Sequence, residues 1–255
     1  MEPLLCGAGE VYLNFGCFYD VEGMSARRDA LLSLREANRA AYPAAYAELA
    51  AARDLIRCAR SAARSVNPEG LFRLTRRLIE LPEPNGSVGR CRDVFLRAWT
   101  PEGLMDFTPD AVSGYRSCAA LADPCALSAP LLERLAQHCQ SAGYDCIRVL
   151  SPIDPSRTEG LLVPALGMAL LTNPASGIKC AVKVDVESFF PQTEQTRELL
   201  ARADACCAAA AARLAEARAI HDELEALCRP YISYEGVDLL TREYKKQLRE
   251  ELLKK

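Results

Sequence analysis

The chain has 255 residues, 50% of them hydrophobic and 25% charged, so it can bury a full core and is not broadly disordered. Its net charge of −3 and pI near 5.6 argue against a nucleic-acid-binding protein, which usually carries a basic face. Because the sequence starts without a secretory signal and holds no apolar stretch near the ~20 residues that cross a bilayer, we expect a soluble, cytoplasmic protein.

The sequence contains twelve cysteines, which is a high count. No C-x-x-C pair occurs and there are only two histidines, so zinc-ligand spacing is absent and we predict no metal site. Several cysteines stand where alanine would serve, as Cys206 and Cys207 do before five alanines, and we interpret them as small packing residues. A thiol-based sensor stays open on the cysteine count alone.

The first of two alanine-rich segments follows Ser25, which can cap a helix continuing to about Ala41. Pro43 is suited to a first helical turn, so it starts or kinks the next stretch. Apolar residues then recur at alternating steps of three and four, which is a heptad seam. The seam residues are Tyr42, Ala45, Leu49, Ala52, Ile56, Ala59 and Ala63.

Short strand candidates replace the heptad pattern in the middle of the chain. They lie at residues 94–99, 114–121, 145–150, 161–171 and 181–186, with a helix at 131–141. Residues 161–171 read as two strands about a turn at Gly167. A strand, a loop, a helix and a strand within about thirty-five residues form the βαβ pattern of a mostly parallel sheet. We therefore predict an α/β core at roughly residues 90–190.

The second alanine-rich segment, residues 193–227, repeats the heptad seam. Its seam residues are Leu200, Ala203, Cys207, Ala210, Leu214, Ala217, His221, Leu224 and Cys228. Each segment is predicted to form one arm of an antiparallel helical hairpin, over residues 25–80 and 193–255. After each arm comes the same phrase, EGLFRLTR at residues 69–76 and EGVDLLTR at 235–242, which indicates an internal duplication.

The loop at residues 122–130 joins a predicted strand to the predicted helix, where a nucleotide-binding βαβ unit places its phosphate loop. A working P-loop reads G-x-x-x-x-G-K-S/T. Its glycines let backbone N–H groups wrap the phosphates, its lysine neutralises them and its hydroxyl holds Mg²⁺.

Further segments, taken in chain order, carry a family resemblance. They are residues 9–19, 95–107 (FLRAWTPEGLMDF), 143–146, 154–155, 160–169, 221–225 and Tyr231. Their order resembles a bacterial family of predicted ATPases built from two tandem P-loop modules, each ending in a long helical hairpin. The resemblance implies a P-loop NTPase-like α/β fold, with residues 1–85 as the remnant of a first module. Residues 86–255 would form a whole second module ending in the hairpin 193–255.

The loop departs from the family's pattern at every phosphate-handling position. Ala122, Cys125 and Leu127 stand at the glycines, Ser128 stands at the lysine, and the two hydroxyl positions follow it. Prolines at 124 and 130 also lack N–H donors. The vestigial nucleotide-binding residues implied by the resemblance are Ala122, Asp123, Cys125, Leu127, Ser128, Ala129 and Pro130. Thr172 lies near the place expected for the family's acidic residue after a strand.

The sequence keeps the sheet and helical arms that the resemblance implies, but its loop lacks the phosphate-handling residues. This combination favours a non-catalytic, degenerate P-loop ATPase-like protein that acts as an interaction or scaffold module. Its arms would serve self-association or pairing with an intact family member, with no nucleic-acid or membrane partner. The alternative is a divergent nucleotide-binding ATPase or kinase, which a partner with an intact P-loop could complete. Only that alternative would need ATP and Mg²⁺; otherwise we expect no cofactor and no catalytic residue.

Each of the two histidines lies near a cysteine with which it could form a nucleophile pair. His221 lies near Cys228 on one helix, but its place on the heptad seam favours a packing role. His138 and Cys139 are adjacent, and adjacent residues point apart on a helix. Neither pair supports an enzyme.

Overall fold

The computed structural model describes residues 13–63, 69–70, 73, 84, 86–174, 177–189 and 193–252. The chain divides into two compact units, one made of Met1–Ala40 with Ala217–Lys255 and the other of Ala41–Glu216. The boundary expected between residues 85 and 86 is of a different kind, because it was drawn between two sequence modules of an expected internal duplication. It stays a prediction, because most of the first repeated phrase and the linker after it lie outside the described residues.

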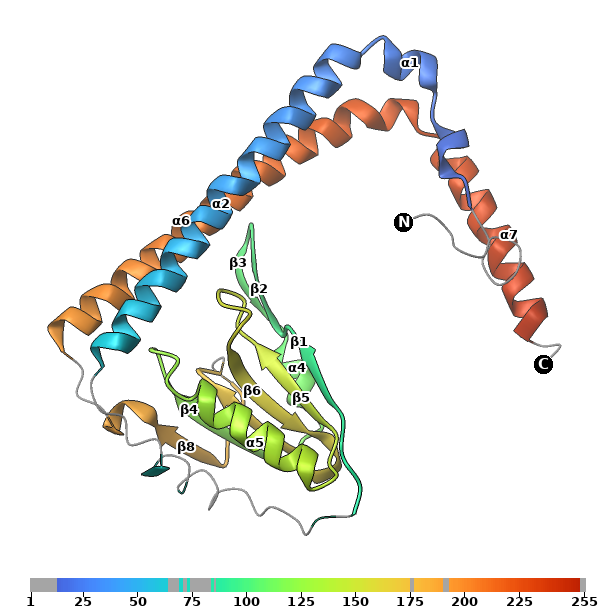
Figure 1. Ribbon diagram of the computed structural model, residues 1–255. Helices are drawn as coiled ribbons and strands as arrows, with labels where there is room; N and C mark the ends of the chain where they lie inside the picture. The colour runs from blue at the N-terminus through green and yellow to red at the C-terminus, as the bar shows by residue number, and fades with distance from the viewer. Residues whose placement is uncertain are drawn as a thin grey trace. The chain divides into compact units, whose positions relative to one another are not determined.

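A six-stranded, mostly parallel sheet forms the centre of the unit Ala41–Glu216, as far as the structure describes it (Figure 1). Its strands are β1 (Cys91–Val94), β4 (Ser117–Ala122), β5 (Cys146–Leu150), β6 (Thr158–Val163), β7 (Met168–Thr172) and β8 (Val182–Asp185). They lie in the order β1-β5-β6-β7-β4-β8. β6 pairs antiparallel with both of its neighbours, and the remaining pairs are parallel. The predicted α/β class is confirmed.

The sheet has two apolar faces, as the near-continuous apolar runs of its inner strands require. One face packs Leu121, Leu161 and Leu170 under helix α5 (Ala129–Ser141), whose Leu132 and Leu135 are fully buried. The other face holds a second cluster of seven buried residues, Val112, Cys118, Ile147, Val149, Leu162, Ala169 and Leu171. Val112 comes from the short helix α4 (Thr108–Val112). α5 therefore covers the face that contains Leu121, and the predicted loop joins β4 to the start of this helix.

The hairpin from β6 to β7 confirms the two strands predicted about Gly167. A 3-10 turn, η2 (Pro164–Leu166), joins them, and Gly167 adopts a left-handed φ of 59° that glycine tolerates without strain. The single strand predicted at residues 94–99 is wrong. The chain leaves the sheet after Val94, and β2 (Arg97–Thr100) pairs with β3 (Gly103–Asp106) in a separate hairpin.

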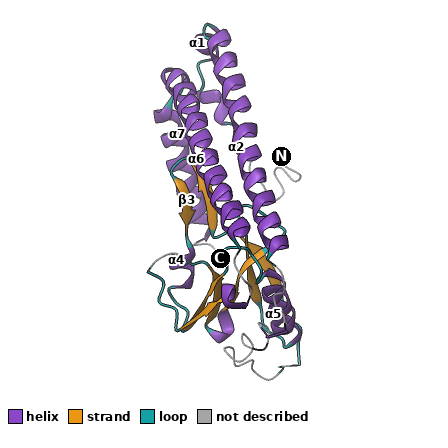
Figure 2. Ribbon diagram, turned by 90° about the vertical axis from the view of Figure 1, so that its left-hand side faces the viewer, coloured by secondary structure: helices purple, strands orange, loops and turns teal. Residues whose placement is uncertain are grey.

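The two long helices, α2 (Arg28–Ala62) and α6 (Glu194–Cys228), pack on each other within the unit Ala41–Glu216 (Figure 2). Ala52 of α2 meets Ala203 and Cys207 of α6 in one buried cluster. Other predicted seam positions are also buried, namely Ala45, Ala59, Ala210 and Leu214. The expected hairpins are corrected in one respect: the long helices of different arms pair with each other.

Two expected helix boundaries are also corrected. Ser25 ends a short helix, α1 (Val21–Ser25), whose N-terminus is capped by the Asp20 side chain accepting from Gly23 N. α2 begins at Arg28 and runs through Pro43 as one helix. A proline removes one backbone donor, and the packing of a 35-residue helix outweighs that single loss here.

The unit formed by the two chain ends joins its segments through backbone bonds. η1 (Phe15–Phe18) and η4 (Arg229–Tyr231) are linked by an isolated bridge between Tyr19 and Ile232, and Asp20 N donates to Tyr231 O at 2.8 Å. Helix α7 (Tyr234–Leu252) follows, and η1 packs against it. Among the helices of the described chain, none is both long and apolar enough to cross a membrane.

Candidate functional site

The predicted phosphate loop lies between β4 and α5, and Asp123 organises it. The Asp123 side chain is buried, with 2% of its surface exposed. Its carboxylate accepts hydrogen bonds from Leu127 N at 2.8 Å, from Ser128 N at 2.6 Å and from the Ser128 hydroxyl at 2.6 Å. One internal anion thus takes up three donors at the start of α5.

This arrangement occupies the position where a nucleotide-binding loop holds a phosphate. The first N–H groups of a helix have no partners within the helix, and together with the helix dipole they attract an anion. Here the backbone donors point at a carboxylate of the same chain. An incoming phosphate would have to displace Asp123 or lie beside it as a second buried negative charge.

Asn173 fixes the backbone of Asp123 from the neighbouring strand. Asn173 Oδ1 accepts from Asp123 N at 2.7 Å, and Asn173 Nδ2 donates to Asp123 O at 2.9 Å. Asn173 follows the last residue of β7 and has a φ of 43°, a left-handed conformation that asparagine tolerates better than most residues. Thr172 donates its hydroxyl to Glu159 O at 2.8 Å, so it ties β7 to β6.

The other predicted loop residues divide between the helix start and the core. Ser128 is the N-cap residue of α5, and Ala129 and Pro130 are its first two residues. Ala122 is the exposed last residue of β4. Cys125 is fully buried in the core under α5, and Leu127 packs against the same cluster. The structure therefore brings Asp123, Leu127 and Ser128 together around one carboxylate.

Ala126 carries the backbone feature that sequence reasoning missed in this loop. Its φ of 54° is left-handed, which glycine adopts easily and alanine does not. The alignment with a P-loop placed glycine positions on either side of it, at residues 125 and 127. The loop therefore has a left-handed turn at a position that the alignment did not mark.

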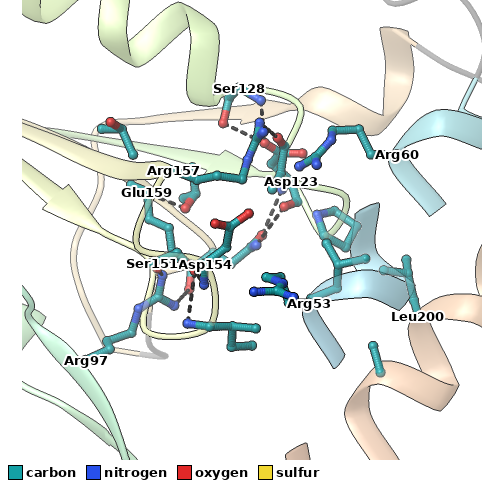
Figure 3. A pocket seen from close by; sticks show the side chains of 18 of the residues that line it. Arg53, Arg60, Arg97, Asp123, Ser128, Ser151, Asp154, Arg157, Glu159 and Leu200 are labelled. Carbon is teal, nitrogen blue, oxygen red and sulfur yellow. Dashed lines mark hydrogen bonds and ion pairs between the residues drawn. The ribbon is translucent and has the colours of Figure 1, made fainter. Parts of the chain in front are cut away.

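A pocket of about 300 Å³ opens beside this loop, at the carboxyl edge of the parallel strands (Figure 3). Its lining includes the residues that directly follow three strands: Asp123 after β4, Ser151 after β5 and Asn173 after β7. Open α/β sheets bind ligands at this edge. α2 and α6 supply the opposite wall, including Arg53, Arg60 and Leu200.

Four arginines line the pocket, and no sequence pattern indicates that they lie together. Arg97 forms an ion pair with Glu159, and Arg53 Nε bonds Asp54 at 3.1 Å. Arg157 donates from Nη2 to Ala126 O at 2.6 Å, while its Nε is buried without a partner. Burial, and after it the charge of Arg157, lowers the pKa of Arg60. These arginines come from α2, from β2 of the separate hairpin and from the loop before β6, so only the fold brings them together.

The histidines form no nucleophile pair. His221 is exposed, and its Nε2 lies 3.2 Å from Glu225, so the packing role predicted for it is wrong. His138 is exposed while Cys139 is buried, as expected for adjacent helical residues, and burial raises the pKa of Cys139 to about 11. The described residues include no group of three metal-ligating side chains.

One cysteine pair stands out from the packing cysteines. The Sγ atoms of Cys118, in β4, and Cys180 lie 3.0 Å apart, and burial followed by this contact raises the pKa of Cys118 to about 12. A raised thiol pKa reduces the thiolate fraction that reacts with oxidants. The thiol-sensor hypothesis stays a prediction.

Comparison of the chain with protein-family models, curated proteins and solved structures found no match.

Proposed function

We propose that this chain is a non-catalytic interaction or scaffold module, built on a P-loop-like α/β fold and related to the tandem P-loop ATPases that its sequence resembles. The observation that carries the proposal is the Asp123 carboxylate, which accepts from Leu127 N and Ser128 N at the start of α5. The loop satisfies its own anion-binding donors. It therefore serves to hold the fold together.

The energetics support the loss of nucleotide chemistry. Micromolar affinity corresponds to about 8 kcal/mol, which a working loop assembles from charge-assisted hydrogen bonds of about 1.5–3 kcal/mol each. Ser128 stands at the lysine position and donates its hydroxyl to Asp123, so it supplies neither a cation nor a Mg²⁺ ligand. Phosphoryl transfer depends almost wholly on positioning and charge, so catalysis is lost with them.

The helical unit at the chain ends supports the interaction part of the proposal. Ala217 is the one residue of its described part that is buried. Leu248 of α7, with 56% of its area exposed, shares one face of the helix with Val237, Leu240 and Tyr244, which precede it at spacings of three and four. Helices with so little buried surface gain stability from a partner that covers their apolar face. That partner would be a second copy of this chain or an intact family member.

Sedimentation velocity over a range of protein concentrations tests self-association. We expect the wild-type chain to associate, and Leu248→Asp to weaken association about tenfold or more, because it puts a charge into an apolar contact. Gln247→Glu is the matched control, since it adds the same charge at an exposed polar position of α7 and should leave association unchanged. A wild-type chain that stays monomeric throughout, or equal behaviour of both variants, contradicts self-association through α7.

The alternative function, a divergent nucleotide-binding ATPase or kinase completed by a partner with an intact P-loop, has one supporting observation. The pocket beside the loop lies at the sheet edge where nucleotide-binding folds hold their ligands, and arginines line it. Binding of Mg-ATP at the start of α5 would favour this alternative.

A further inference from the structure

We propose that the pocket at the carboxyl edge of the sheet binds a small molecule through a carboxylate or phosphate group held between the guanidinium groups of Arg60 and Arg157. This site adjoins the phosphate position at the start of α5, which Asp123 fills, because Asp123 and Ser128 also line the pocket. The inference does not depend on the proposed scaffold function, because a protein can bind a small anion without nucleotide chemistry.

First, Arg60 and Arg157 both have guanidinium N–H groups without an acceptor among the described residues. The guanidinium group of Arg60 forms no hydrogen bond or ion pair with any described residue, although it is partly buried in the pocket wall. Arg157 uses Nη2 on Ala126 O, and its buried Nε has no acceptor. A guanidinium group carries five N–H donors in a planar fork that matches the oxygens of carboxylate and phosphate groups. Both arginines therefore present unused donors of one chemical kind.

The second step is their mutual repulsion. The positive charge of Arg157 is close enough to lower the pKa of Arg60, after the larger effect of burial. In Figure 3, Arg60 and Arg53 extend from α2 toward Asp123 and Asp154, with Arg157 on the far side of the pocket. An anion between two guanidinium groups would remove this repulsion and supply acceptors to both.

The third step concerns the acidic side chains that face the same arginines. Asp123 and Asp154 attract Arg60 through space. The Asp123 carboxylate is, however, engaged by the loop donors, and Asp154 Oδ1 accepts from the backbone and hydroxyl of Ser156. Glu159 is paired with Arg97. Asp204 of α6 also lines the pocket. These acids thus soften the positive field, but in the part of the chain that the structure describes none of the four forms an ion pair with Arg60 or Arg157.

The size and walls of the pocket limit what else the ligand carries. A volume of about 300 Å³ is at the low end for small-molecule sites, which run from about 300 to 1,000 Å³. Ile56, Ile153 and Leu200 provide apolar wall. The ligand is therefore a small organic acid or phosphomonoester with a short apolar body, and a whole nucleoside triphosphate is too large.

Thermal shift and calorimetry on the full chain test the site with inorganic phosphate and with succinate, against potassium chloride at matched ionic strength. We expect saturable binding of at least one anion, and the one that binds identifies the group. Arg60→Gln and Arg157→Gln should each weaken binding about tenfold or more, through lost charge-assisted hydrogen bonds. Arg134→Gln, at an exposed arginine of α5 that does not line the pocket, is the matched control and should bind like wild type.

Two outcomes would overturn the inference. One is stabilisation by both anions no greater than that by potassium chloride. The other is wild-type affinity in both glutamine variants. Circular dichroism checks that each variant folds, and Arg60→Lys provides a second variant at that position, since it keeps the charge but loses the planar fork. Its affinity should lie between those of wild type and Arg60→Gln, and an affinity equal to wild type would also count against the site.

Discussion

Replacing Asp123 with alanine should lower the free energy of unfolding by about 3–5 kcal/mol. The carboxylate is buried and accepts three hydrogen bonds, from Leu127 N, Ser128 N and the Ser128 hydroxyl. Its removal leaves buried donors without an acceptor and opens the start of α5. Asp123→Asn should cost less, because the amide keeps one acceptor oxygen but loses the charge.

Urea unfolding at constant pH measures this effect. Asp110→Ala is the matched control, because that aspartate is exposed in the first turn of the short helix α4 and should change stability by no more than about 0.5 kcal/mol. Equal stability of Asp123→Ala and the control would show that the carboxylate does not organise the loop.

Replacing Ala52 with leucine should lower the free energy of unfolding by about 1–3 kcal/mol. Ala52 is fully buried on α2, where it contacts Ala203 and Cys207 of α6. Three more carbons at this point force the two helices apart or strain their side chains, because protein interiors have little free volume. The expected loss of unfolding free energy comes from the disturbed packing of α2 on α6.

Ala51→Leu isolates the packing effect, since residue 51 is the exposed neighbour on the same helix. Leucine and alanine are both good helix formers, so this control should change stability little. Thermal and urea unfolding of the two variants compare them directly. A leucine at position 52 tolerated as well as one at position 51 would contradict the buried contact between the helices.

Apolar runs and heptad spacing predicted most of the helices and strands, because these patterns record which residues of an element are buried. The apolar run about Gly167 gave two strands, and the heptad spacing of Ala45, Ala52 and Ala59 correctly marked a buried helix face. The heptad spacing does not indicate which element packs against that face, so the pairing of α2 with α6 was not predicted. The strand predicted at residues 94–99 failed because its apolar residues divide between β1 and the β2–β3 hairpin.

The place of the loop in the fold was predicted, but its hydrogen bonds were not. The loop between β4 and α5 was located correctly, and Asp123 and Ser128 were among its named residues. Their hydrogen bonds depend on a left-handed turn at Ala126, which sequence alone does not indicate. Arg60 and Arg157 are far apart in sequence and become neighbours only when α2 packs at the edge of the sheet.

Amide NMR of the ¹⁵N-labelled chain during titration with Mg-ATP tests the central claim most directly, by following the N–H groups of Leu127 and Ser128. These two amides donate to Asp123 in the structure. We predict that both resonances stay in place up to millimolar Mg-ATP, apart from changes that matched ionic strength also produces. Saturable shifts of both amides at micromolar Mg-ATP would show that a phosphate displaces Asp123, and would contradict the proposal that this loop has lost its nucleotide.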